Sequence, residues 1–99
     1  MKMVFLVCNS YNSGRLMKLL AELGIDYYTS WDKAIGKGRG TEPHLGTSTF
    51  GSTNTVVMIA FEDEAALEAL VQGIGGVNGA IARAADRIRL FAMPLERIV

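Results

Sequence analysis

The stretch Thr55–Ile74, TVVMIAFEDEAALEALVQGI, contains a strand and the helix that follows it. Its first seven residues form an uninterrupted apolar run of the length expected for a central strand. Three acids, Glu62, Asp63 and Glu64, come next, where the dipole of a following helix favours negative charge. The helix is expected to be broken up near its end by glycines within residues 73–76. Its buried stripe is expected at Ala66, Leu67, Leu70, Val71 and Ile74.

The chain before this stretch holds a strand, a helix and a second strand. Met3–Val7 is a continuous apolar run of strand length. Tyr11–Leu23 is predicted to be helical, because residues able to cap a helix precede a run of leucines at helical spacing. Gly24 follows, where helices commonly end in a left-handed residue. Ile25–Lys33 has the aromatic and β-branched composition of a strand.

The chain after it holds one more strand. The segment 76–86 is compatible with a loop, or with a loop and a short alanine-rich turn. Ile88–Met93 is predicted as the last strand, with Pro94 tolerated near its end at a sheet edge. This order predicts a single α+β domain over residues 1–99, a ferredoxin-like βαββαβ sandwich with a long loop between strands 2 and 3. Both helices would cover one sheet face, so oligomerisation through the other apolar face is expected.

Composition narrows the classes of partner. Ten basic and ten acidic residues cancel, which argues against nucleic acid, because phosphate binding needs a positive excess. A membrane-spanning helix needs about 18 or more apolar residues, and no apolar run in the sequence approaches that length. The N-terminal apolar run is also too short for a signal peptide. The lone Cys8 allows no internal disulfide, which suits a reducing cytoplasm, and its place at a strand end predicts a buried, inert thiol.

Residues typical of metal sites and of catalytic groups are sparse. His44 is the only histidine, and with Glu42 nearby it still lacks further ligands, so we expect no metal site. No Ser-His-Asp, Cys-His or paired-carboxylate arrangement can be proposed from the sequence. We therefore do not expect an enzyme.

The long loop, Ala34–Asn54, is the distinctive segment. It is rich in glycine, serine and threonine, and loops longer than about 12–15 residues are usually functional or disordered. Ile35–Thr41 alternates glycines with Lys37 and Arg39, a pattern that exposes backbone N–H groups beside positive charge. The pattern is compatible with phosphate binding and equally with an ordinary solvated loop, because such runs are weakly specific.

Several short motifs, taken together, resemble the PII signal-transduction family of trimeric nitrogen-regulatory proteins. They are the pair Gly24-Ile25 entering the second strand, Trp31 before the loop, and Gly-Lys-Gly-Arg at residues 36–39. The ending Arg89–Glu96 likewise resembles the last PII strand. The resemblance spans nearly the whole chain. It implies a homotrimer with nucleotide-binding clefts between subunits and a flexible T-loop that docks onto a transporter, an enzyme or a transcription factor.

The resemblance also implies roles for particular residues. Gly36, Gly38, Arg39 and Arg89 would contact the phosphates of a small anionic effector, such as ADP, ATP or AMP. Lys37 joins this set because its charge lies within the same glycine-rich run.

The chain departs from the PII pattern within the loop and before the last strand. Glu42, His44 and Phe50 would meet the partner protein, but no tyrosine follows Tyr28, so regulation by nucleotidylylation is not expected. The glycine-rich turn before the last strand is replaced by Ala-Asp-Arg-Ile at residues 85–88. Without those glycines the backbone cannot wrap a triphosphate in the same way, which favours a smaller or different ligand.

Two other functions remain compatible with the same order of elements. An enzyme of the acylphosphatase type needs an arginine cradle and a positioned asparagine after the first strand, where this chain has Asn9 and Arg15. An RNA-recognition motif needs aromatic residues on strands one and three to stack bases, but the third strand has only the terminal Phe61. One fold hosts many functions, so the fold alone does not separate these alternatives.

Overall fold

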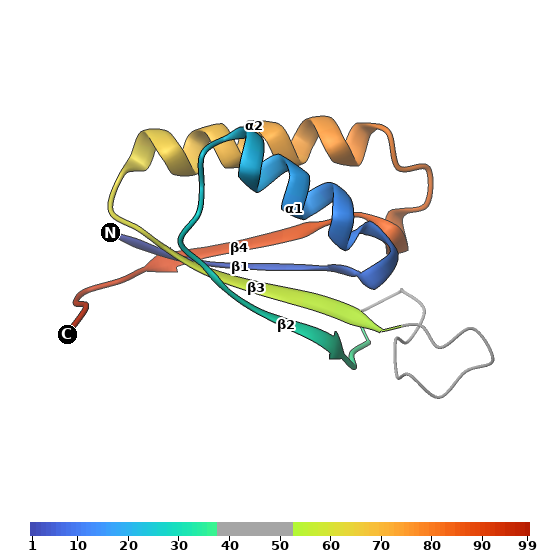
Figure 1. Cartoon of the computed structure of the whole chain (residues 1–99), viewed down its shortest axis with the longest axis horizontal. Coiled ribbons are helices and arrows are strands. Elements are labelled where there is room, and N and C mark those ends of the chain that lie inside the picture. Colours follow the sequence, from blue (N-terminus) through green and yellow to red (C-terminus); the bar gives the residue numbers. More distant parts are fainter. Residues whose placement is uncertain (38–52) are drawn as a thin grey trace.

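The computed structural model describes residues 1–37 and 53–99. Within them, four strands form one antiparallel sheet in the order β2-β3-β1-β4, and both α-helices lie on the same face of it (Figure 1). This arrangement confirms the ferredoxin-like βαββαβ sandwich. The elements are β1 (Lys2–Asn9), α1 (Ser13–Glu22), β2 (Thr29–Ala34), β3 (Asn54–Phe61), α2 (Glu64–Gly79) and β4 (Arg89–Pro94). No helix among the described residues is long and apolar enough to cross a membrane.

The core lies between the helices and the sheet. Alternate residues of β1 and β3 point toward the helices and are buried, as the two-residue period of a strand requires. The helices meet them with leucines and isoleucine at helical spacing. The buried side chains that form this layer include Val4, Leu6, Cys8, Leu16, Leu19, Leu20, Val57, Ile59, Phe61, Leu67, Leu70 and Ile74.

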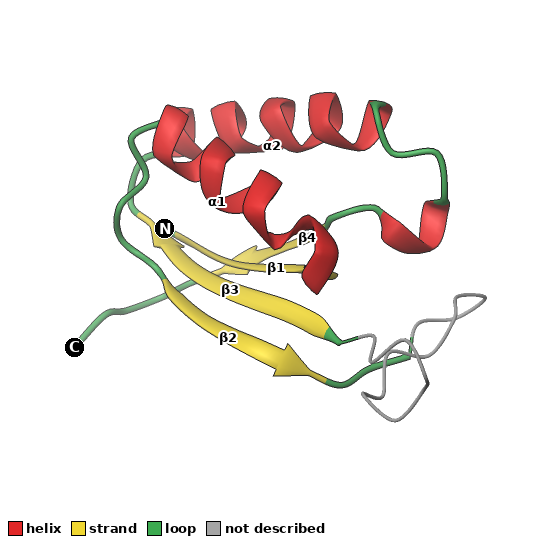
Figure 2. Ribbon diagram, turned by 45° about the vertical axis from the view of Figure 1, so that its right-hand side comes forward, coloured by secondary structure: helices red, strands yellow, loops and turns green. Residues whose placement is uncertain are grey.

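The other face of the sheet has no helix over it in either view (Figures 1 and 2). The strand register places one set of apolar side chains there, because Phe5 lies opposite both Met58 and Phe91. Trp31, Phe91 and Met93 are 48%, 45% and 41% exposed. We call this surface the open face, and its residues are Met3, Phe5, Val7, Trp31, Val56, Met58, Ala60, Arg89, Phe91 and Met93.

Helix α2 differs from the prediction, because its glycines do not break it and it continues to Gly79. Gly73 lies against α1, where an added Cβ would come 2.7 Å from Leu19 Cδ1. Near the helix end, Asn78 donates to the Ile88 carbonyl and accepts from the Ile88 N–H, both at 2.8 Å. These tertiary contacts outweigh the low helix propensity of glycine.

Two further details of the second half were predicted differently. Val71 is 40% exposed, so it does not belong to the buried stripe of α2. The segment 76–86 is not all loop, because the helix takes its first residues, while the short alanine-rich turn is present as a 3₁₀ helix at Ala84–Asp86.

The bounds of the first helix and of the second strand also differ from the prediction. A 3₁₀ turn at Ser10–Asn12 precedes α1, and Asn9 caps it by accepting the Tyr11 N–H at 3.0 Å. Gly24 adopts φ of 71°, which confirms the left-handed end of the helix. Residues 25–28 are not strand; Ile25 is buried instead, and its N–H donates to the Leu20 carbonyl at 2.9 Å.

Candidate functional site

The two stems of the long loop lie side by side at one end of the sheet. Ala34 and Asn54, predicted as loop ends, are the last and first paired residues of β2 and β3, and they face each other in the register. Gly36 is half-buried, and a Cβ added there would lie 3.1 Å from Asn54 Nδ2, a close approach that suits glycine. Lys37 follows and is exposed. The other predicted site residues in the loop lie outside the described residues: Gly38, Arg39, Glu42, His44 and Phe50.

A cluster of polar side chains joins these stems to the end of β1. We call it the stem network, and it comprises Ser10, Asp32, Thr53 and Thr55. Asp32 Oδ1 accepts hydrogen bonds from the Thr55 hydroxyl at 3.0 Å and from the Ser10 hydroxyl at 3.4 Å. The Ser10 and Thr53 hydroxyls share a bond of 3.0 Å, and the Ser10 N–H donates to the Thr53 carbonyl at 2.9 Å. Ser10, which directly follows β1, therefore contacts residues of both loop stems.

The backbone beside Asp32 is in an unusual conformation. Lys33 has φ of 59°, and the register of β2 and β3 shifts between Trp31 and Ala34, which marks a bulge. A lysine in the left-handed region is strained. The Lys33 N–H donates to Asp32 Oδ1 at 2.9 Å and so helps to hold this conformation. The hydrogen bonds from Thr55 and then from the Lys33 backbone lower the pKa of Asp32 below its usual value.

Sequence reasoning missed the stem network. The side-chain hydrogen bonds of Ser10 join it to residues that lie 22 to 45 positions away in the sequence. Serine, threonine and aspartate are also common at strand ends. Only the strand register brings them together, so no local signal in the sequence indicates the network.

Arg89 lies on β4, at the edge of the sheet opposite to β2, the strand that carries the first loop stem. It faces Val7 in the register, Val7 faces Val56, and Val56 faces Trp31. Three strand spacings of about 4.8 Å separate Trp31 from Arg89 by roughly 14 Å. The Arg89 guanidinium lies 5.6 Å from the centroid of the Phe91 ring on the open face. One chain therefore does not bring Arg89 together with the described stem residues Gly36 and Lys37.

A polar cavity of about 300 Å³ lies where the start of α1 meets the connection after α2. It brings together Asn9 and Arg15, the two residues on which the acylphosphatase alternative depends. Asp86 lines the same cavity, and its Oδ1 lies 3.5 Å from Asn9 Nδ2. A carboxylate there repels a doubly negative acyl phosphate. The observed lining therefore counts against the phosphatase.

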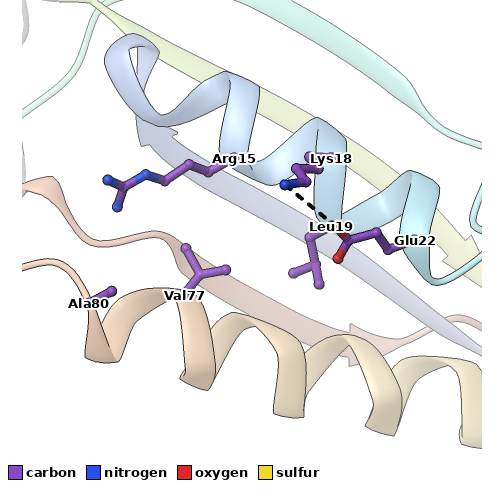
Figure 3. A pocket seen from close by; sticks show the side chains of 6 residues that line it. All are labelled: Arg15, Lys18, Leu19, Glu22, Val77 and Ala80. Carbon is purple, nitrogen blue, oxygen red and sulfur yellow. Dashed lines mark ion pairs between the residues drawn. The ribbon is translucent and has the colours of Figure 1, made fainter.

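An apolar groove of about 270 Å³ adjoins this cavity between the two helices (Figure 3). Arg15 and Ala80 line both the cavity and the groove, while Leu19 and Val77 line the groove and not the cavity. On its rim, Lys18 and Glu22 form an exposed ion pair at 3.9 Å (Figure 3). Such a pair contributes little to stability.

Cys8 offers no reactive group at this end of the sheet. It is buried, and burial, with a smaller effect of the Asp32 charge, raises its pKa from 9.0 to about 11. The predicted burial is confirmed, and a raised pKa favours the protonated thiol, which is the less reactive form. Across residues 1–37 and 53–99 there is no group of three histidine, cysteine or acidic side chains that could hold a metal ion.

Comparisons with known proteins establish the fold. No protein-family model matches the chain, and no curated protein matches it. Among solved structures it is similar to CPII, a nitrogen regulatory PII-like protein from Thiomonas intermedia K12, bound to ADP, AMP and bicarbonate. The identity is 17% and the TM-score 0.68, over 97% of this chain and 88% of that one. For CPII bound to ADP and bicarbonate, the identity is 16% and the TM-score 0.66, again over 97% of this chain and 88% of that one. The resemblance to PII-like proteins is thus confirmed at the level of the fold.

Proposed function

We propose that this chain is a PII-like regulatory protein that assembles as a homotrimer. In this proposal it binds an adenine nucleotide or a similar small anion between subunits, and it controls a partner protein through the long loop. The observation that carries the proposal is the open face, an apolar sheet surface that ends in Arg89 at one edge and the loop stems at the other.

The open face supports self-association. Large apolar patches that remain exposed on a chain commonly mark interaction surfaces. Here Trp31, Phe91 and Met93 contribute exposed apolar area from both edge strands, while β1 and β3 contribute the half-buried side chains between them. Copies that meet through this face would cover all four strands.

Assembly also supplies a reason for the distance between the predicted site residues. Arg89 and the stem residues Gly36 and Lys37 lie at opposite sheet edges, and in the proposal residues of both kinds meet around one ligand where two copies adjoin. Arginine and lysine suit phosphate groups, and glycine allows close backbone approach. The fold's known relatives support the ligand class, because CPII structures hold ADP, AMP and bicarbonate.

The turn before β4 supports an effector smaller than ATP. Three of its backbone donors are already used. The Asp86 N–H donates to the Arg83 carbonyl at 3.0 Å and the Arg87 N–H to the Ala84 carbonyl at 3.2 Å. The N–H of Ile88 is held by Asn78. A triphosphate would need such donors to be free, so ADP or AMP fits the turn better than ATP.

The loop supports control of a partner such as a transporter or an enzyme. The stem network fixes both ends of the loop to the sheet, so a ligand that contacts Gly36 or Lys37 acts on an anchored base. In the proposal, Glu42, His44 and Phe50 supply the acidic, polar and aromatic contacts with the partner.

Sedimentation equilibrium at micromolar concentration tests the assembly. The expected mass is three times the 10.7 kDa of one chain. Phe91→Glu should dissociate the trimer, because it places charge within the open face. Val71→Glu is the matched control, because Val71 is similarly exposed but lies on α2. A wild-type monomer would overturn the proposal.

Calorimetric titration with ADP and AMP tests the ligand. Arg89→Gln should weaken binding by about tenfold or more, the effect of losing a charged hydrogen bond. Arg97→Gln, an exposed arginine beyond β4, should bind as the wild type does. A trimer that binds neither nucleotide would keep the assembly and remove the nucleotide from the proposal.

A further inference from the structure

The polar cavity between the start of α1 and the connection after α2 is lined by charges of both signs. Arg15 and Asp86 both line it, together with the amide side chains of Asn9 and Asn12. We propose that this cavity binds a small zwitterion of the α-amino-acid class, with an apolar side chain. None of its residues is among the proposed phosphate contacts, and it meets the turn before β4 only at Asp86, so either proposal can fail without the other.

The two charges have unused bonding capacity. Arg15 has no ion-pair or hydrogen-bond partner within residues 1–37 and 53–99. Asp86 Oδ1 receives one long hydrogen bond of 3.5 Å from Asn9, and its Oδ2 forms a partly exposed ion pair with Arg83 Nε at 3.8 Å. Arg15 and Asp86 form no ion pair with each other, although both line the cavity. A ligand that carries a carboxylate and an ammonium can satisfy both at once.

The amides of the cavity are held in place by the protein. Asn9 is buried, and its Oδ1 accepts the Tyr11 N–H at 3.0 Å. Asn12 Nδ2 donates to the Asp86 carbonyl at 2.7 Å, which leaves Asn12 Oδ1 as an acceptor for a ligand ammonium. These bonds fix the amide orientations before any ligand binds, and preorganised groups lose less entropy on binding.

The apolar part of the ligand has space beside the charges. Ile81 and Ala80 line the cavity, and the adjoining groove continues past Arg15 to Val77 and Leu19. In Figure 3 the Arg15 side chain extends from α1 toward the Ala80 end of α2, with Val77 and Leu19 between the helices. A branched aliphatic side chain of the size of leucine would cover these surfaces.

The charge pattern discriminates against simpler ligands. A carboxylic acid without an amine would place a second negative charge near Asp86, and an amine alone would place a second positive charge near Arg15. Inorganic phosphate meets the same repulsion from Asp86. Binding should therefore require both charged groups of the amino acid.

A matched set of probes tests this requirement by ¹⁵N-resolved amide shifts. L-leucine is expected to shift amides of residues 9–15 and 80–86. The compounds that lack one charged group, 4-methylpentanoate and 3-methylbutylamine, should bind about tenfold more weakly, as should phosphate. Equal binding of 4-methylpentanoate or phosphate would show an anion site and overturn the proposal. So would the absence of shifts with L-leucine at about 10 mM, ten times a millimolar Kd.

Two variants locate the charges. Arg15→Gln and Asp86→Asn should each weaken L-leucine binding by about tenfold, and Asp86→Asn keeps an oxygen to accept from Asn9. Arg97→Gln should leave it unchanged. Unfolding curves of each variant separate loss of binding from loss of structure. Wild-type affinity in either folded charge variant would overturn the proposal.

Discussion

Gly73 allows the two helices to approach each other closely, and its replacement should show how far that approach matters. A Cβ built on Gly73 would lie 2.7 Å from Cδ1 and 3.1 Å from Cδ2 of Leu19, inside ordinary contact distances. Gly76 lies three residues along the same helix, and nothing lies within 4 Å of a Cβ built there. Alanine at the two positions therefore differs mainly in the contact with Leu19.

The expected free energies follow from these two environments. Alanine in place of a helical glycine stabilises by about 0.8–1.0 kcal/mol. Gly76→Ala should gain about this amount and raise Tm by roughly 4–8 °C. Gly73→Ala makes the same gain but forces an added methyl into a buried leucine, and overpacking costs about 1–3 kcal/mol. Its net effect should be a loss of roughly 0–2 kcal/mol.

Chemical denaturation followed by circular dichroism at equal protein concentrations measures both values, since self-association makes apparent stability depend on concentration. A double-mutant cycle with Leu19→Ala then identifies the contact. The single leucine change should destabilise by about 2–5 kcal/mol, and the double variant by less than the sum, because the added methyl fills space that the leucine leaves. If Gly73→Ala stabilises as much as Gly76→Ala, the helices are not held this close and the reasoning is wrong.

Three further predictions concern the stem network and the core. The pKa of Asp32 is lowered from 3.8 in the folded protein, so the ionised carboxylate stabilises the fold above pH 3.8. This contribution is lost as the pH falls through the lower pKa of the folded state. Asp32→Asn should therefore make the free energy of unfolding less sensitive to acid below pH 3.8. Lys33→Gly relieves a left-handed strain of about 1–2 kcal/mol and adds about 0.5–1 kcal/mol of unfolded-state entropy, so denaturation should show a net gain of roughly 0.5 kcal/mol. Cys8, with its pKa raised to about 11, should react with iodoacetamide at pH 8 much more slowly in the native than in the denatured protein; equal rates would show that the thiol is accessible.

Most of the fold follows from local patterns in the sequence. The apolar runs that became β1 and β3 and the leucine spacing of α1 were sufficient, because each pattern matches the period of its element. The same reasoning failed where tertiary contacts outweigh local preference. Glycines near residue 75 suggested a break, yet contacts with Leu19 and Ile88 keep α2 continuous to Gly79.

The site was less predictable than the fold. The loop and its stems could be found because a long glycine-rich segment between two strands is conspicuous in sequence. The stem network could not, because Ser10, Asp32 and Thr53 meet only through the strand register and carry no motif. The charged cavity joins Asn9 and Arg15 to Asp86, more than 70 residues away, and no local pattern in the sequence places that acid beside them.

The separation of Arg89 from the loop stems has a thermodynamic consequence for the proposed regulator. Trp31, which precedes the β2 stem, lies roughly 14 Å from Arg89 across three strand spacings of one sheet. The proposal therefore places a ligand that contacts both Arg89 and the β2 stem at a boundary between copies. Such a ligand binds the assembly and not the separate chain, so it stabilises the assembly by mass action. By linkage, anything that weakens the open face weakens ligand affinity as well. Assembly through the open face and effector binding are then one coupled equilibrium. Met93→Glu, a change on the open face that is not among the proposed phosphate contacts, should lower affinity for ADP together with the mass of the particle.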